Sequence, residues 1–548
     1  MSTTHEVFNQ VTPLADVNLF SGNAALRDAV RFNAPQLDVA ALVELGAMAG
    51  SADMQVHARL ANHVKPALKT HDSVGRRIDA VEFHPSYHAL LGAAVERGLA
   101  GVPWARPAGG HVERAAGFML FTELEPSVLC PVSMTYAVAP ALRANAGLWA
   151  DWGAKLTAGR YDPRALPVTQ KTGVTMGMGM TEKQGGSDVR ANTTRAEFVG
   201  DDDWGRRAHI TGHKWFLSAP MCDAFLVLAQ SPGGLSCFLV PRVLRDGSAN
   251  ALCLQRLKDK LGNWANASSE VEFDAAQGWL VGEEGRGVPQ ILAMGSLTRL
   301  DCALGTAGLM RQALSLALNH TAQREAFGKR LIAQPLMQAV LADLALESEA
   351  ATALALRLAR AIDRSEQGDA DETALRRLLT PPTKFWVCKR GSHFAQEAME
   401  CLGGNGYVED DCAGVMTRVY REMPLNSIWE GSGNIMAIDL LRALRGVAAD
   451  EILRAEVAPA LGRNASLDHA AERLFSLLAD APEEAQARGL ARDLALVMQG
   501  ALLAQHSPEW VFDAFCRTRL AASSDVFGVL PAQVDAKALV ERASLTAA

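Results

Sequence analysis

The stretch Met180-Thr-Glu-Lys-Gln-Gly-Gly-Ser-Asp-Val189 places a threonine and a serine on either side of a glycine pair. Glycine lets a ligand approach the backbone closely, and the hydroxyls of Thr181 and Ser187 can each donate a proton to a carbonyl or phosphate oxygen. The same residue types also dominate ordinary surface turns. Taken alone, the stretch indicates either a turn or a cradle for a flat cofactor with a polar edge.

Length and composition bound the class of protein. A chain of 548 residues is too long for one ordinary core. With 49% hydrophobic and 21% charged residues and no apolar run near the ~18 residues of a membrane span, it predicts a globular protein that does not enter membranes. The N-terminus has no export-signal pattern, and the nine cysteines are dispersed without a C-x-x-C pair. These features predict a reduced, cytoplasmic protein.

The texture of the sequence changes along the chain. Residues 1–171 contain alanine- and leucine-rich periodic segments that predict helices, such as 40–48 and 87–97. Residues 172–287 contain short β-favouring runs bounded by Gly, Pro, Asp and Asn, which predict strands at 209–211, 224–228, 237–240 and 270–273.

Long apolar periodicity returns after residue 287. Residues 288–445 predict helices at 290–319, 334–363 and 382–399, and residues 446–548 predict a further helical extension. The sequence therefore predicts an α+β fold: an N-terminal helical domain, a central β domain, a helical bundle and a C-terminal helical extension.

Charge argues against a strong nucleic-acid footprint. The net charge of the chain is -8, and from residue 447 onward nine Lys and Arg stand against fourteen Asp and Glu. An acidic helical segment favours a packing or assembly element, although Arg517, Arg519 and Arg542 remain candidates for a local basic patch.

Residues 213–218, His-Lys-Trp-Phe-Leu-Ser, predict a strand on which Phe216 and Ser218 share one side. An aromatic plane beside a hydroxyl suits the wall of a flavin site, and it equally suits an aromatic pair in a sheet core. Arg324-Glu-Ala-Phe-Gly-Lys329 offers a guanidinium for a phosphate, but a glycine and flanking cations also suit a helix stop.

Two glycine-rich segments follow. Leu402-Gly-Gly-Asn-Gly-Tyr407 is not a dinucleotide fingerprint, because it follows a predicted helix rather than a strand, but its glycines allow close approach of a ligand or a neighbouring chain. Trp429-Glu-Gly-Ser-Gly-Asn434 places one carboxylate between an indole and a flexible turn. Partial burial would raise the pKa of Glu430 toward the range useful for abstracting a carbon-bound proton. Alternatively, Glu430 is an acid stabilised at a helix N-terminus.

The sequence does not support metal-dependent or serine-dependent hydrolysis. The 13 histidines show no H-E-x-x-H or comparable metal-ligand spacing, and the chain has no G-x-S-x-G motif. The sequence therefore predicts no metal site and no serine nucleophile.

Six motifs occur in the order found in the acyl-CoA dehydrogenase family, which the chain resembles over about residues 172–445. They are Met-Thr-Glu-x-x-Gly-Gly-Ser-Asp at 180–188, residues 212–218, Lys-Leu-Gly at 260–262, Arg-x-x-Phe-Gly at 324–328, Leu-Gly-Gly-Asn-Gly-Tyr at 402–407 and Trp-Glu-Gly-Ser-Gly-Asn at 429–434. The length, the Glu-Lys-Gln of the first motif and the extra C-terminal helices most resemble the AidB-like branch, whose members are linked to the adaptive response to DNA alkylation. The resemblance implies non-covalent FAD and a homotetramer.

The resemblance assigns a role to each matching position. Those that match FAD contacts are Met180, Thr181, Gly186, Ser187, Phe216, Ser218, Arg324, Phe327, Gly403, Gly404, Ser432 and Asn434. Phe216 takes the place of a tryptophan against the flavin, and Ser218 that of a threonine near its reactive nitrogen. Arg324 and Phe327 match residues that reach the FAD of a neighbouring subunit. Glu400 stands where the family commonly has glutamine, so it is not assigned to the cofactor site.

Glu430 falls at the family's usual catalytic base, and the alternative base position on an earlier helix holds Thr298. The resemblance thus implies that Glu430 removes the α-proton of an acyl thioester while the β-hydride passes to the flavin. Trp429 and Arg442 are candidates for the substrate pocket, although an arginine is more often solvated or structural.

Two functions remain open at this stage, and a nitroalkane-oxidising relative is a less favoured third because its base would be an aspartate. One is an FAD-dependent acyl-CoA dehydrogenase that acts on an acyl thioester. The other is a flavoprotein that associates with double-stranded DNA, protects it against alkylation and has weak or vestigial dehydrogenase activity. The flavin motifs support both equally.

Overall fold

The computed structural model of the protein describes residues 4–106, 108–409, 415–446, 448–480, 482–522 and 524–545. Contacts divide the chain into two compact units, each assembled from segments far apart in the sequence. The sheet unit comprises Val56–Gly110 and Glu125–Asp301. The helical unit comprises Met1–Gln55, His111–Leu124 and Cys302–Ala548.

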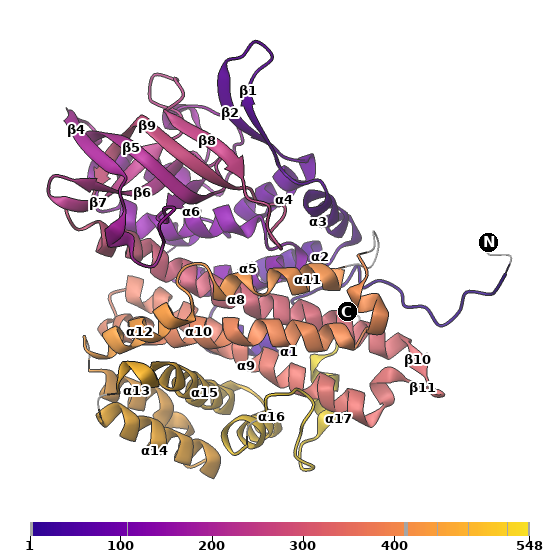
Figure 1. Ribbon diagram of the computed structural model, residues 1–548. Helices are drawn as coiled ribbons and strands as arrows, with labels where there is room; N and C mark the ends of the chain where they lie inside the picture. The colour runs from indigo at the N-terminus through magenta and orange to yellow at the C-terminus, as the bar shows by residue number, and fades with distance from the viewer. Residues whose placement is uncertain are drawn as a thin grey trace. The chain divides into compact units, whose positions relative to one another are not determined.

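A seven-stranded sheet forms the centre of the sheet unit (Figure 1). Its strands are β3 (Met176–Gly179), β4 (Arg195–Asp202), β5 (Gly205–Ser218), β6 (Ala224–Ser231), β7 (Gly234–Pro241), β8 (Leu252–Leu257) and β9 (Ser268–Val281). They run in the order β3–β6–β4–β5–β9–β7, with β8 beside β9. Because β7 also pairs with β6, the sheet closes on itself. The four runs predicted as strands lie in β5, β6, β7 and β9.

Helices cover one side of this sheet (Figure 1). The helices of the sheet unit are α4 (Pro85–Glu96), α6 (Leu129–Leu142), α7 (Ala146–Leu156) and, from Val56 onward, α3 (Ala52–His63). Helix α6 is almost entirely buried, and its Thr135 Oγ1 accepts a hydrogen bond of 2.9 Å from the Met176 N–H at the start of β3. This contact fixes the strand that leads directly into the 180–189 turn.

The predicted N-terminal helical region also contains two strands that the sequence did not indicate. Residues 67–82 form a β-hairpin, β1 (Ala67–His71) and β2 (Arg77–Glu82). The reason is turn chemistry: the Asp72 carboxylate accepts hydrogen bonds of 2.9 Å from the N–H groups of Val74 and Arg76, and Gly75 supplies a φ of 83°. A short polar hairpin carries little apolar periodicity, so the pattern of hydrophobic residues does not reveal it.

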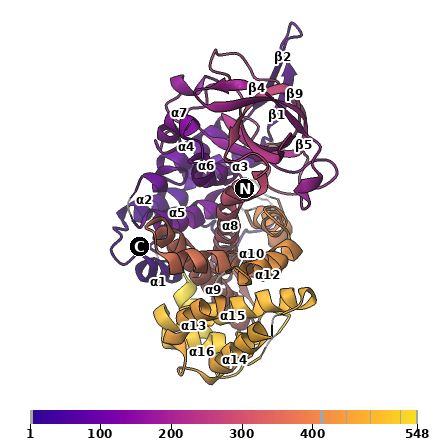
Figure 2. The same cartoon turned by 90° about the vertical axis from the view of Figure 1, so that its left-hand side faces the viewer.

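Helices make up most of the helical unit (Figure 2). They are α1 (Ala24–Asn33), α2 (Ala40–Ala49), α5 (Gly110–Leu124), α8 (Gly287–Gln323, from Cys302 onward), α9 (Pro335–Glu366), α10 (Ala370–Glu400), α11 (Val415–Glu422), α12 (Gly433–Leu444), α13 (Ala449–Val457), α14 (Ala465–Ala479), α15 (Ala487–His506), α16 (Glu509–Phe515) and α17 (Ala536–Ala543). The predicted helices at 290–319, 334–363 and 382–399 lie within α8, α9 and α10.

Helix α9 is the core of this unit. Its residues are buried almost without interruption from Leu341 to Asp363, because α1, α10, α15 and α17 pack around it. The charged residues on this buried surface are held by partners from other helices, as in the 2.8 Å pair between Arg357 and Glu372.

These ion pairs correct the expected basic patch of the C-terminal extension. Arg519 binds Asp343 at 2.6 Å, and Arg542 binds Glu349 at 2.9 Å and Asp28 at 2.7 Å. Both guanidinium groups are therefore neutralised inside the unit and hold the extension against α9. Of the three arginines proposed for a patch, only Arg517 is exposed.

Within the described ranges, no helix combines the length and the apolar content needed to cross a membrane. Among the described cysteines, Cys222, Cys237, Cys388, Cys401 and Cys516 are buried free thiols.

Candidate functional site

The buried carboxylate of Glu182 anchors the 180–189 turn. Its side chain is completely buried and accepts hydrogen bonds from Lys214 Nζ at 2.7 Å, from the Thr193 N–H at 2.7 Å and from the Thr194 N–H at 3.1 Å. Burial by itself raises the pKa of Glu182, but Lys214 and the threonine donors outweigh it and hold that pKa well below its ordinary value. The turn is therefore a rigid, anchored structure rather than a loose surface loop.

The predicted donors stand on the open side of this turn. Thr181 is half-buried and Ser187 is exposed, and within the described part of the chain neither hydroxyl has a hydrogen-bond partner. A Cβ added at Gly186 would lie 2.5 Å from Thr181 Oγ1. Glycine is therefore needed at 186, because any side chain there would displace the threonine hydroxyl. Met180 is half-buried, and its carbonyl accepts a 3.0 Å hydrogen bond from Asn192 Nδ2.

The turn is joined to the end of β5. The Trp215 N–H donates a 2.8 Å hydrogen bond to the Thr181 carbonyl, and the register of β5 against β9 shifts between Lys214 and Leu217. This bulge leaves Leu217 completely buried and Phe216 48% exposed, with Ser218 half-buried. Phe216 is thus not a core residue, and the alternative interpretation of an aromatic pair in the sheet core is wrong.

Cations surround this aromatic surface. Lys258 Nζ lies 3.2 Å from the centre of the Trp215 ring and 4.8 Å from that of Phe216. The Ser218 hydroxyl lies 3.3 Å from that of Ser268, which also accepts a 3.2 Å hydrogen bond from Lys260. Lys258 is paired with Glu270 at 2.6 Å, so the end of β5 presents an exposed aromatic ring beside hydroxyls, which suits a planar group with a polar edge.

In the helical unit, Glu430 has a left-handed backbone conformation with a φ of 60°. This conformation costs free energy for a residue other than glycine, so its surroundings must hold it. The buried Lys384 of α10 does so: its Nζ donates hydrogen bonds of 2.9 Å to the Trp429 carbonyl and 2.5 Å to the Gly431 carbonyl. One lysine thus clamps the two carbonyls on either side of Glu430 and sets the direction of its half-buried side chain.

Glu430 is not an acid in the first turn of a helix. Helix α12 begins at Gly433 with Ser432 as its N-cap, so Glu430 lies two residues before the cap. Ser432 and Asn434 are exposed, and Asn434 Oδ1 accepts a 2.7 Å hydrogen bond from Arg488. The alternative of a macrodipole-stabilised helix acid is therefore wrong.

The two candidate pocket residues differ. Trp429, the residue before Glu430, is half-buried. Its Nε1 donates a 3.0 Å hydrogen bond to Asn426 Oδ1, which fixes the orientation of the indole. Arg442 is exposed on α12. Among the described residues Arg442 has no ion pair or side-chain hydrogen bond, so its charge is available to a ligand or to solvent.

Gly403 and Gly404 open a short 3₁₀ turn after α10. Both are exposed, Gly403 has a φ of 60°, and a Cβ added to either would meet no described atom within 4 Å. The positive φ explains a glycine at 403, but packing within this chain does not explain why residue 404 is also a glycine. A ligand or a neighbouring chain that approaches the backbone would explain it.

Arg324 and Phe327 belong to a β-hairpin that follows α8, with strands β10 (Glu325–Ala326) and β11 (Lys329–Arg330). Phe327 and Gly328 form its two-residue turn, with φ values of 54° and 74°. Gly328 thus shapes a hairpin and does not cap α8, so the helix-stop interpretation is wrong. Phe327 is 97% exposed, and the half-buried Arg324 donates a hydrogen bond to the Asn9 carbonyl.

The structure thus brings the predicted residues together in groups. Within the sheet unit the 180–189 turn adjoins the end of β5, and within the helical unit residues 429–434 form one kinked segment ahead of α12. Sequence reasoning missed Glu182, Lys214 and Lys384, which shape these groups from inside. The sequence offered no clear signal for the two lysines, because β5 and α10 each contain several other charged residues.

The residues present fit FAD. The turn offers two unpaired hydroxyls beside a glycine, β5 offers an exposed aromatic ring, and Gly403 and Gly404 leave room for close approach to the backbone. Within the described ranges, no three His, Cys, Asp or Glu side chains are arranged to hold a metal ion.

Comparison with known proteins agrees with this geometry. Residues 9–163 match the model of the adaptive response protein AidB N-terminal domain, 177–276 the acyl-CoA dehydrogenase middle domain and 285–445 the acyl-CoA dehydrogenase C-terminal domain. The chain is 47% identical over 521 residues to AidB of Escherichia coli (strain K12), covering 94% of both chains. It is 30% identical over 489 residues to acyl-CoA dehydrogenase family member 11 of Caenorhabditis elegans, covering 82% of this chain and 77% of that one.

Among solved structures, Caenorhabditis elegans ACDH-11 in complex with C11-CoA superimposes with a TM-score of 0.83 at 25% identity, covering 100% of this chain and 94% of the other. Fold, motifs and identity over nearly the whole length point the same way. The chain therefore belongs to the acyl-CoA dehydrogenase family of CH–CH oxidoreductases, in its AidB-like branch, and its cofactor is FAD.

Proposed function

We propose that the protein oxidises an acyl thioester between its Cα and Cβ atoms, with Glu430 as the catalytic base. The observation that carries this proposal is the clamp on Glu430. A buried lysine holds the carbonyls of Trp429 and Gly431, on both sides of this half-buried glutamate, and so stabilises its left-handed backbone conformation.

In the proposed reaction, the Glu430 carboxylate accepts the α-proton while the β-hydrogen leaves as a hydride, so that a double bond forms between Cα and Cβ. FAD, when bound, supplies the hydride acceptor at its N5 atom. As the α-proton leaves, negative charge develops on the thioester oxygen. The Glu430 backbone N–H is assigned to that oxygen, since a donor placed on the developing charge lowers the barrier.

Trp429 and Arg442 are assigned to the substrate pocket. The rigid indole of Trp429 offers an apolar wall, and the exposed guanidinium of Arg442 suits an anionic group such as a phosphate of a thioester carrier. The acyl-CoA class of substrate is supported by the similar Caenorhabditis elegans structure, which holds C11-CoA.

The residues assigned to FAD fall into two sets. Thr181 and Ser187 would donate hydroxyl protons to FAD, Phe216 would supply an aromatic wall, and Ser218 would contact the flavin. Met180 and Gly186 shape the same turn. Ser432, Asn434, Gly403 and Gly404 are the contacts assigned to the helical unit. The proposal assigns both sets to FAD. Its direct test is anaerobic bleaching of the flavin by a panel of acyl-CoAs: if none bleaches it, the dehydrogenase proposal fails.

Lys384→Met is expected to lower kcat for acyl-CoA oxidation by about 10- to 100-fold, because Glu430 loses the clamp that aims it. KM should change much less, since Lys384 is a positioning residue that touches backbone rather than substrate. Stopped-flow bleaching and steady-state kinetics measure both. Lys384→Arg, which keeps the charge and donors, should restore part of kcat.

The matched control is Lys537→Met, at a lysine whose side chain is 73% exposed in the same unit. It should leave kcat unchanged. Equal losses in kcat and in thermal stability for Lys384→Met and Lys384→Arg would contradict a positioning role.

We also propose a homotetramer in which the 324–330 hairpin serves a neighbouring subunit. Phe327→Asp should lower FAD retention and shift the protein toward smaller species, because a 97% exposed ring in a left-handed turn contributes nothing to its own subunit. Analytical ultracentrifugation and flavin absorbance check this. Unchanged mass and flavin content would contradict the proposal, and an altered unfolding midpoint of the isolated subunits would point to a local fold defect.

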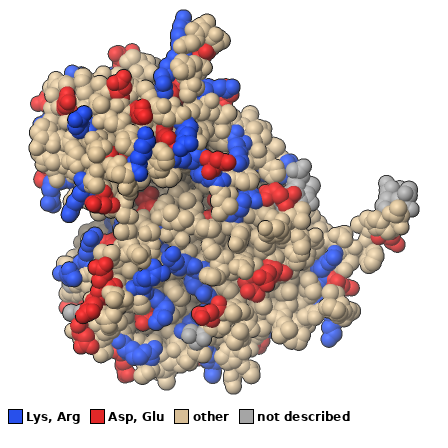
Figure 3. All heavy atoms as spheres, viewed as in Figure 1, with Lys and Arg blue, Asp and Glu red and all other residues tan. Residues whose placement is uncertain are grey.

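A second candidate function, protection of DNA, rests on charge. Arg442 and Arg445 are exposed at the end of α12, and Figure 3 shows Lys and Arg side chains gathered over α10 and α12 with acidic side chains around them. Because neutralised phosphates make affinity fall with salt, duplex DNA should be titrated at several salt concentrations. Absence of binding at low salt would eliminate this candidate.

A further inference from the structure

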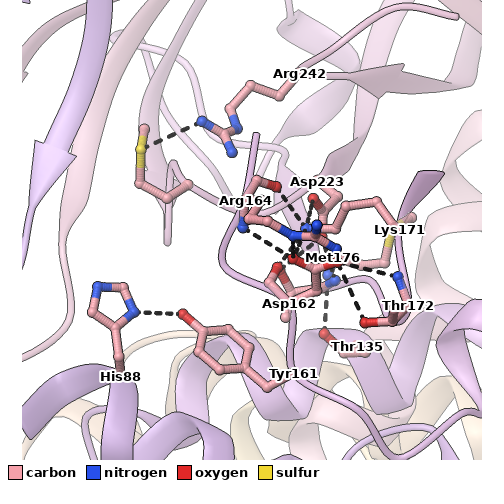
Figure 4. A network of polar contacts seen from close by, with 12 residues as sticks. His88, Thr135, Tyr161, Asp162, Arg164, Lys171, Thr172, Met176, Asp223 and Arg242 are labelled. Carbon is pink, nitrogen blue, oxygen red and sulfur yellow. Dashed lines mark hydrogen bonds and ion pairs between the residues drawn. The ribbon is translucent and has the colours of Figure 1, made fainter. Parts of the chain in front are cut away.

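A cavity of about 250 Å³ lies wholly within the sheet unit, and none of the residues assigned above to the dehydrogenase reaction lines it. Its walls come from α4, from residues 161–165, from residues 219–222 after β5 and from Arg242 after β7. Figure 4 shows this region, with Arg242 on one side and His88 and Tyr161 on the other.

Arg242 forms no ion pair among the described residues, and Asp223, the carboxylate that acts on it from farther away, is bound by Lys171 at 2.9 Å. The Arg242 guanidinium carries five N–H donors, yet its side chain makes one hydrogen bond among the described residues, a weak one of 3.6 Å to the sulfur of Met221. Its Nε is buried and has no partner there. A half-buried guanidinium that lines a cavity in this state is costly unless a ligand accepts its protons.

Nearby carboxylates do not serve Arg242, because other cations already bind them (Figure 4). Arg164 binds Asp162 at 2.8 Å, and the buried Lys171 binds Asp223 at 2.9 Å. Two acids are thus matched by two other cations. The charge of Arg242 is not matched by a further acid among the described residues, so the wall of the cavity carries a net positive charge.

A second polar group faces the same cavity. His88 Nδ1 and the Tyr161 hydroxyl lie 2.7 Å apart, and both residues are lining residues. Burial lowers the pKa of His88 and raises that of Tyr161, so both are neutral near pH 7. A neutral pair adds a hydrogen-bonding site without adding a charge.

Part of the wall is apolar, beside the polar lining residues Asp162, Thr175 and Cys222. Phe83 and Tyr87 stack with ring centres 3.9 Å apart, and Val81, Leu91 and Met221 complete this surface. An apolar cavity of about 150 Å³ can hold benzene. A cavity of about 250 Å³ therefore has room for one ring or a branched chain together with a small polar group.

We infer that this cavity is a binding site for a small monocarboxylate with an apolar body, whose carboxylate pairs with Arg242 and whose body lies against Phe83 and Tyr87. A guanidinium binds a carboxylate through two parallel hydrogen bonds. A dianion such as phosphate is disfavoured, because Arg242 is the one cationic lining residue in the described part of the chain and the apolar part of the wall offers a phosphate no hydrogen-bond donor.

Benzoate is the probe. Titration calorimetry of the full-length FAD-loaded protein should give one benzoate per chain. Arg242→Met should weaken binding by about 10- to 100-fold, the usual contribution of hydrogen bonds to a charged group. The control Arg195→Met, at an exposed arginine on β4 outside the cavity, should bind as the parent does. Benzyl alcohol, which has the ring but no charge, should bind more weakly than benzoate.

A second variant keeps the inference testable if Arg242→Met does not fold. Ala165 lines the cavity but is exposed, so Ala165→Trp should block entry while every charge stays in place, and it should also abolish binding. The inference is overturned if the parent binds no benzoate, if Arg242→Met or Ala165→Trp binds it as tightly as the parent, or if inorganic phosphate binds more tightly than benzoate.

Discussion

Glu430→Gln is expected to slow anaerobic bleaching of the flavin by an acyl-CoA about 10²- to 10⁴-fold, the contribution typical of a positioned general base. Glutamine has nearly the shape of glutamate but cannot accept the α-proton. The Lys384 clamp acts on the backbone of residues 429 and 431, so the loop should keep its conformation. The rate of bleaching in a stopped-flow instrument is the measurement.

Two controls separate the loss of the base from damage to the site. Flavin content and acyl-CoA affinity of Glu430→Gln should stay close to those of the parent, since neither depends on proton transfer. Glu451→Gln, at an exposed glutamate in the same unit, should bleach at the parent rate. Bleaching of Glu430→Gln at the parent rate would remove Glu430 from the mechanism.

Lys214→Met is expected to destabilise the sheet unit by about 3–5 kcal/mol, the cost of leaving one partner of a buried ion pair unpaired. Lys214 and Glu182 are both completely buried, and Nζ lies 2.7 Å from Oε1. The change leaves Glu182 charged in a cavity without a cation. Urea-induced unfolding, with flavin release recorded in parallel, measures the loss.

The double variant Glu182→Gln/Lys214→Met should recover part of this loss, because it removes the stranded charge as well. Lys183→Met is the matched control, since that exposed side chain lies in the same turn and makes no contact with Glu182. A double variant less stable than Lys214→Met would show that the hydrogen bonds of Glu182 to Thr193 and Thr194 matter more than its charge.

The sequence predicted the fold class well because the signals are periodic. Strands such as β6 contain a run of apolar residues bounded by turn residues, and α9 repeats apolar residues over many turns. It failed on the β1–β2 hairpin, whose strands are short and polar. There Asp72 and Gly75, rather than periodicity, decide the structure.

The candidate site was predictable in part. Motif order proposes Thr181, Ser187, Phe216 and Glu430 as site residues, whereas each segment alone was ambiguous between a structural and a functional interpretation. The β-bulge that exposes Phe216 and the N-cap at Ser432 that leaves Glu430 outside the helix decide those two cases. Neither feature follows from local propensity, since both depend on which residues β9 and α10 place opposite them.

By itself, the sequence determined the order of elements, the flavin motifs and the identity of the only acid at the base position. The tertiary structure decided what those residues can do. It buried Lys214 under the 180–189 turn and Lys384 behind Glu430, and it drew Arg519 and Arg542 into ion pairs instead of a surface patch. The physical reason is that desolvation and pairing of a charge depend on neighbours hundreds of residues away, whereas strand and helix periodicity is written in consecutive residues.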